Sequence, residues 1–195
     1  MADRTSATRT GPETVIPLSP RQQRLVLASL AVHRLLLLEH DLPTLLQGVC
    51  DRLIADGLNP AAWMVLLDSE MGNVITAEAG LGEQFAPIMD LLRHSRLPEC
   101  CRTSVEHEGC GVPLSCCRLQ CCGPERKCCA LACSVSCHEG LLLFLVVIRD
   151  GEEHPEEEEL RLISDLADSI ARGIRGLFLA EEARQREKRL RQAEE

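Results

Sequence analysis

The spacing of apolar residues changes along the chain, and this change limits the folds that the chain can adopt. Leucine and alanine recur at three- and four-residue steps over 21–39 and 44–55, which predicts two helices. Short apolar runs separated by turn-like residues over 62–79 and 127–148 predict two hairpins. Helical spacing returns over 83–94 and from Glu156 onward. Helices are therefore expected at both ends of the chain, with extended segments between them.

The length of 195 residues has room for one ordinary domain with flanking helices. Residues 1–20 are rich in Thr, Ser and Pro and are expected to form a flexible leader. The domain is expected to span 21–179. Residues 180–195 carry Glu–Arg and Glu–Lys pairs at helical spacing, which predicts an exposed signalling-helix or coiled-coil linker.

Charge and composition argue against several classes of function. The net charge of −9 and the aromatic content of 2% argue against nucleic-acid binding. No apolar run is long enough for a bilayer, and the N-terminus does not have the pattern of a signal peptide. We therefore expect a cytoplasmic protein whose cysteines are thiols, metal ligands or redox groups rather than structural disulfides.

Three segments resemble one known family. They are Leu97-Pro98-Glu99-Cys100-Cys101-Arg102, the strand–Gly–strand pair ending in 141–149, and the acidic start and apolar stripe of 156–184. Together with the order of elements, they resemble the GAF domains of bacterial signal-transduction proteins. The resemblance implies an α+β fold, with an antiparallel sheet, N- and C-terminal helices packed on one face, and a Cys-rich loop over the other.

In that family the outgoing helix usually feeds a PAS domain, a histidine kinase or another output module. The resemblance therefore implies a sensor of the two-component type. This chain departs from the family pattern in two ways. The loop from Cys110 to Cys122 is much richer in cysteine, and no output domain follows residue 195. We expect either a piece of a larger sensor or a stand-alone partner protein.

Eleven of the twelve cysteines fall between Cys100 and Cys137, which indicates local chemistry. Thiolates bind zinc, copper(I) and iron–sulfur clusters, although the lack of any Cys-x-x-Cys argues against a zinc ribbon or ferredoxin-type run. An iron–sulfur cluster or zinc is the suspected cofactor. The candidate metal ligands are Cys100, Cys101, Cys110, Cys116, Cys117, Cys121, Cys122 and Cys128, with His107 as a nitrogen ligand that could join them.

Other cysteines have a simpler explanation as small core residues. Cys129, Cys133 and Cys137 would share one face of a strand with Leu131 and Val135, and Cys50 lies on a helical apolar stripe. For Cys129 and Cys133, packing and function remain equal alternatives. Redox-active thiols remain an alternative to metal binding in the loop, because nearby arginines such as Arg118 and Arg126 could lower thiol pKa values.

The leading hypothesis is a sensory domain, with no catalytic residues assigned. A metal, iron–sulfur cluster or redox signal at the cysteines would change the packing of the helix from Glu156 onward, which would pair with its counterpart in a parallel homodimer. A cysteine-dependent redox enzyme of the same fold and a metal-storage protein are the alternatives.

Overall fold

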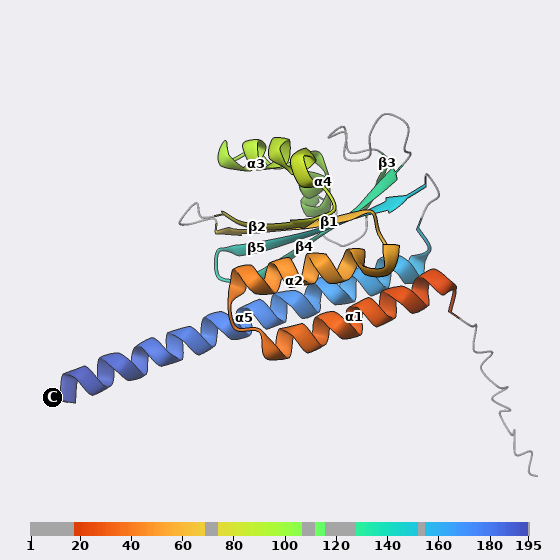
Figure 1. Cartoon of the computed structure of the whole chain (residues 1–195). Coiled ribbons are helices and arrows are strands. Elements are labelled where there is room, and N and C mark those ends of the chain that lie inside the picture. The colour runs from red at the N-terminus through yellow and green to blue at the C-terminus, as the bar shows by residue number, and fades with distance from the viewer. Residues whose placement is uncertain (1–17, 69–73, 107–111, 116–127, 152–154, 195) are drawn as a thin grey trace, which may run out of the picture.

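The computed structural model describes residues 18–68, 74–106, 112–115, 128–151 and 155–194. They form a five-stranded antiparallel sheet in the order β2-β1-β5-β4-β3 (Figure 1). The strands are β1 (Ala61–Asp68), β2 (Val74–Ala79), β3 (Val112–Ser115), β4 (Cys128–His138) and β5 (Leu141–Asp150). The two predicted hairpins are confirmed. The apolar run of β5 lies between β1 and β4 and is buried on both faces, as its composition predicts.

Three helices cover one face of the sheet: α1 (Pro20–Leu38), α2 (Leu42–Ile54) and α5 (Glu157–Glu194). α2 and α5 lie against the strands, and α1 lies along both of these helices (Figure 1). Ser19 begins α1 with a capping box that includes Gln22, and Asp41 caps α2 through Thr44. The prediction that the terminal helices share one face is therefore confirmed.

Two glycines lie where α1 approaches the neighbouring helices. A Cβ at Gly48 of α2 would lie 2.6 Å from Leu35, and a Cβ at Gly173 of α5 would lie 2.7 Å from Leu36. Both leucines are on α1, so α1 approaches each neighbouring helix at a position without a side chain. The main core lies between this layer and the sheet.

Shorter helices cover the described part of the second face: η2 (Gly82–Phe85), α3 (Ala86–Arg93) and α4 (Glu99–Glu106). Trp63 of β1 packs against Phe85, with ring centroids 6.0 Å apart. These side chains belong to a second apolar cluster that also contains residues of α3, α4, β4 and β5. The sheet thus separates two cores.

The Cys-rich part of the chain contains two regular elements that the sequence analysis did not predict. Residues 99–106 form α4, because Cys100, Cys101 and Ser104 share a buried helical stripe. Residues 112–115 form β3 at the edge of the sheet, where Pro113 is tolerated because an edge strand can lack one N–H donor. Apart from 112–115, the predicted Cys-rich loop from Cys110 to Cys122 lies outside the described residues. Residues 1–17 of the leader predicted over 1–20 also lie outside them, and Pro20 begins α1.

α5 is a single helix of 38 residues that continues beyond the sheet (Figure 1). Its last fully buried side chain is Ile174, and almost every residue beyond Leu179 is exposed. The boundary between domain and linker at 179/180 stays a prediction. None of the helices in the described ranges is both long and apolar enough to cross a bilayer.

Candidate functional site

Three of the predicted metal ligands meet in the second core. Cys100 and Cys101 of α4 and Cys128 of β4 belong to the same apolar cluster, and all three are buried. α4 contacts β4 directly, which brings two cysteine-bearing elements together although the 21 residues of 107–127 separate them in the sequence. The structure therefore places Cys100, Cys101 and Cys128 in one apolar cluster, and their role as ligands stays a prediction.

The remaining candidates, Cys110, Cys116, Cys117, Cys121, Cys122 and His107, lie outside the described residues. Within the described part of the chain, no group of three or more His, Cys, Asp or Glu side chains is arranged to hold a metal ion. Cys128 and Cys133 are each disulfide-bonded. They lie on opposite faces of β4, so they are not bonded to each other. The sequence analysis expected thiols, metal ligands or redox groups rather than structural disulfides, and Cys128 and Cys133 are not free thiols in this structure.

The predicted alternation of β4 side chains is confirmed. Cys129, Cys133 and Cys137 face the helical layer and belong to the main core, whereas Cys128 faces the second core. Cys50 also belongs to the main core and is completely buried, as its helical stripe predicts.

The free thiols in the main core are poorly suited to ionise. Burial raises the pKa of the Cys137 thiol to about 12. Burial also raises the pKa of Cys50, with a smaller contribution from the charges of Asp51 and Glu78. At Cys129 burial raises the pKa although the nearby Arg149 guanidinium opposes the shift. Since the thiolate is the reactive form, these three side chains act as packing groups in the folded state.

The sequence analysis missed a buried charge cluster at the start of α5. Glu159 is 5% exposed, and its carboxylate accepts a hydrogen bond of 2.8 Å from Nε of Arg21 and lies 3.3 Å from Nη1 of Arg149. Arg21 also donates to the carbonyl of Leu58 and to Oδ1 of Asn59, both at 2.9 Å. The cluster joins α1, the end of β5 and the start of α5. We name these three charged residues the Arg21–Glu159–Arg149 cluster.

An acidic run at a helix start, such as 156–159, is typical of a solvated surface. Glu159 is instead buried, because it lies four residues before Ile163 on the same stripe of α5 that packs on the sheet. This four-residue spacing is the sequence signal that could have predicted the burial of Glu159. Nε and Nη1 of Arg149 are buried and make no hydrogen bond within the described structure, so Arg149 depends on its ion pair with Glu159.

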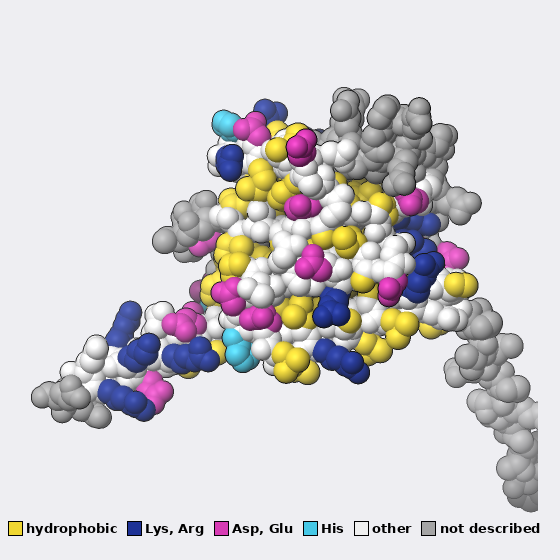
Figure 2. All heavy atoms as spheres, viewed as in Figure 1, with side chains coloured by type: hydrophobic (Ala, Val, Ile, Leu, Met, Phe, Trp, Pro, Cys, Tyr) yellow, Lys and Arg dark blue, Asp and Glu magenta, His cyan; other side chains and the backbone are white. Residues whose placement is uncertain are grey.

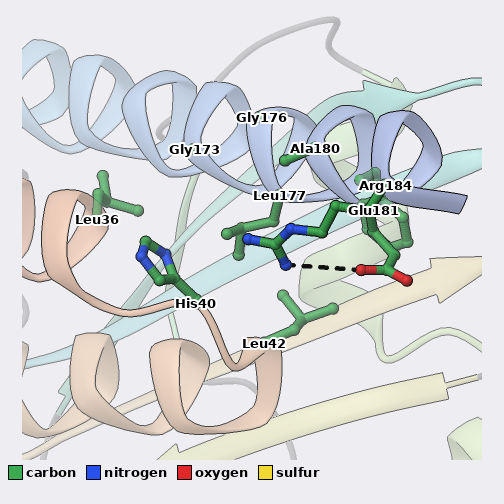
Figure 3. A pocket seen from close by; sticks show the side chains of 10 residues that line it. Leu36, His40, Leu42, Gly173, Gly176, Leu177, Ala180, Glu181 and Arg184 are labelled. Atoms are coloured by element: carbon green, nitrogen blue, oxygen red, sulfur yellow. Dashed lines mark ion pairs between the residues drawn. The ribbon is translucent and has the colours of Figure 1, made fainter. Parts of the chain in front are cut away.

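The point where α5 leaves the domain is lined by side chains from three elements. On one side, the His138 ring at the β4–β5 turn stacks on Phe178 at 6.2 Å, and its Nε2 lies 3.4 Å from Glu182. On another side is a groove of about 510 Å³. In Figure 3 the α1–α2 connection with His40 faces α5 across this groove. Gly173, Gly176 and Leu177 are among the α5 residues that line it.

No protein-family model matches the sequence, and no curated protein matches it. Solved structures do match. The GAF domain of a phosphoenolpyruvate-protein phosphotransferase from Coxiella burnetii is 16% identical with a TM-score of 0.59, and the match covers 83% of this chain and 98% of that one.

Two further GAF domains match over similar ranges. One is from a protein assigned as a sensor histidine kinase of Pseudomonas syringae pv. tomato, with 18% identity, a TM-score of 0.54 and coverage of 85% of this chain and 92% of that one. The other is from an Acinetobacter phosphoenolpyruvate-protein phosphotransferase, with 13% identity, a TM-score of 0.54 and coverage of 85% and 97%. The sheet order, the helical layer and these matches together show that the chain has the fold of a bacterial GAF domain.

Proposed function

We propose that this chain is a cytoplasmic sensory domain that converts a change at its clustered cysteines into a change in the packing of α5. One observation carries the proposal: β4 holds four of the cysteines and packs directly against α5, the helix that leaves the domain. A shift in the position of β4 would therefore act directly on α5. The same strand also contacts α4, which holds Cys100 and Cys101.

The chemistry of the signal is proposed as a metal, an iron–sulfur cluster or a thiol–disulfide change at the α4–β4 side. Cys100, Cys101 and Cys128 would contribute from the described elements, and Cys110, Cys116, Cys117, Cys121 and Cys122 would complete the set. The disulfide-bonded state of Cys128 and Cys133 favours the thiol–disulfide form of the signal. Soft thiolate ligands favour zinc or an iron–sulfur cluster if the signal is a metal.

The output is proposed to run through a parallel homodimer to a histidine kinase, a PAS domain or another output module. The matched Pseudomonas GAF domain belongs to a protein assigned as a sensor histidine kinase, which supports this context. The exposed second half of α5 also has the length and charge pattern of a linker helix.

The test combines composition with helix dynamics on the full chain. After anaerobic purification, metal and sulfide analysis and an absorption spectrum identify any bound cofactor. Hydrogen exchange is then measured before and after chelation or thiol reduction. We expect the exchange rate of α5 amides over 173–184 to change at least roughly tenfold, with α2 unchanged as an internal control. The proposal would be contradicted by a metal-free protein in which the amide exchange rates of α5 do not change with the oxidation state of the thiols.

A further inference from the structure

The part of α5 that leaves the domain contacts the turn between β4 and β5. Between Leu179 and Ala193, Glu182 is the one described side chain of α5 that is not exposed. Figure 2 shows mainly charged side chains on the part of α5 that extends beyond the domain, with few hydrophobic ones. Glu182 is therefore the last partly buried side chain of the described helix.

One histidine contacts this exit of α5 in two ways. The ring of His138 stacks on Phe178, with ring centroids 6.2 Å apart and an interplanar angle of 11°. Its Nε2 lies 3.4 Å from Oε1 of Glu182. Phe178 and Glu182 are four residues apart and therefore lie on the same face of the helix. The face of the imidazole thus packs on one turn of α5, and its polar edge reaches the next turn.

A β-bulge turns His138 towards α5. The register between β4 and β5 shifts by one residue between Ser136 and His138, so Cys137 is an extra residue in β4. With strict alternation, residue 138 would share the face of Cys128 and point towards the second core. Cys137 instead packs in the main core, and His138, the next residue, also reaches the helical layer. A β-bulge redirects a side chain in this way.

The contact with Glu182 depends on the charge of the imidazole. Imidazoles in proteins change charge between about pH 5 and 8. A protonated His138 forms an ion pair with Glu182, whereas a neutral ring makes a weaker polar contact. Other charged groups around it in the described structure are Arg186, 3.6 Å from Glu182, the exposed Glu139 in the turn, and Asp68 at the end of β1, two strands away.

From these observations we infer that His138 is a proton-sensitive clamp that holds the exit of α5 against the β4–β5 turn. Protonation of the ring tightens the contact with Glu182, and loss of the proton leaves mainly the stack on Phe178. The inference deepens the proposed function and rests on it in one respect: it names the turn as a place where a shift of β4 would reach α5. The mobility of the α5 exit then depends on pH as well as on the cysteines.

The test measures amide hydrogen exchange over 176–186 in the full chain at about pH 8 and about pH 6. The rates are expressed as protection factors, which correct for the intrinsic effect of pH on exchange. Lowering the pH should raise the protection of the wild-type chain by roughly threefold, since a partly exposed ion pair contributes modestly. His138→Ala removes both the stack and the ion pair, so it should lower protection roughly tenfold at the lower pH.

Two conservative variants separate charge from packing. His138→Phe keeps an aromatic ring on Phe178 and should lose only the pH dependence of α5 protection. Glu182→Gln removes the carboxylate with little change in size and should lose it too. His94→Ala is the matched control, because His94 forms a similar pair on α3, with Nδ1 3.6 Å from Asp90, across the sheet from α5. Circular dichroism checks that each variant is folded.

The outcomes separate this inference from the proposed function. Equal protection of wild-type α5 at both pH values overturns the inference, and so does a pH response that survives in His138→Phe. Loss of the pH response in that variant, with the His94 control unchanged, supports it. If α5 responds to the state of the cysteines but not to pH, the proposed function stands without the clamp. If α5 responds to pH through His138 but not to the cysteines, the proposed function alone is wrong.

Discussion

Replacing Glu159 by glutamine should destabilise the protein by about 3 kcal/mol, because it removes the anion of the Arg21–Glu159–Arg149 cluster. Removing one partner from a buried ion pair typically costs about 3–5 kcal/mol. The lower end applies here, since Arg21 is 28% exposed and can regain water, and it keeps its bonds to Leu58 and Asn59. Arg149 cannot regain water in the same way, because it is 9% exposed.

The assay is urea and thermal unfolding followed by circular dichroism. For a chain of this size, about 3 kcal/mol corresponds to a decrease in Tm of roughly 6–12 °C. Glu158→Gln is the matched control: it is the preceding residue with the same chemical change, and its carboxylate is 41% exposed beside Arg161. We expect the control to change the free energy of unfolding by about 0.5 kcal/mol or less.

A second comparison separates charge from packing. The double change Glu159→Met with Arg149→Met removes both buried charges and should recover most of the loss, because no charge is then left unpaired in the core. If Glu159→Gln costs no more than its Glu158 control, the argument that this carboxylate stabilises the ends of three elements is wrong.

Three further predictions concern the backbone, the thiols and the second core. Gly80→Ala should lower the free energy of unfolding by roughly 3 kcal/mol or more, because the φ of Gly80 is +85° and a Cβ would lie 2.2 Å from the Pro60 carbonyl oxygen. Gly57 has a φ of +64° and open space around it, so Gly57→Ala should lower the free energy of unfolding by only about 1 kcal/mol in the same urea assay. Burial raises the pKa of Cys137 from 9.0 to about 12. Its contribution to stability is therefore fully present below pH 9.0 and is lost as pH rises towards about 12. The urea midpoint should fall over that window, and Cys137→Ala should reduce the fall; a pH-independent midpoint would contradict the burial argument. Trp63→Ala should destabilise the protein by about 3–5 kcal/mol in the same assay, because this sole tryptophan is buried against Phe85; a cost below that of an ordinary surface change would show that the second core contributes little.

The cysteines show which features of the candidate site can be predicted from the local sequence pattern. The alternation along β4 correctly assigned Cys129, Cys133 and Cys137 to one face and Cys128 to the other, because side chains of a strand alternate whatever covers them. Which cysteines share a cluster did not follow from spacing. Cys100 and Cys128 belong to one apolar cluster because α4 packs onto β4.

The helices at both ends, the two hairpins and the central position of β5 can be predicted from the sequence alone, because each depends on a pattern that repeats within a few residues. Only the tertiary structure decided that 99–106 is a helix, that Pro113 lies in an edge strand, and that Glu159 is buried between two arginines. The tertiary structure also places exposed leucines of α1 next to a groove that glycines of α5 help to line. These features depend on contacts between elements that are separated in the sequence, or on the edge of a sheet, and a local pattern does not show which elements will meet.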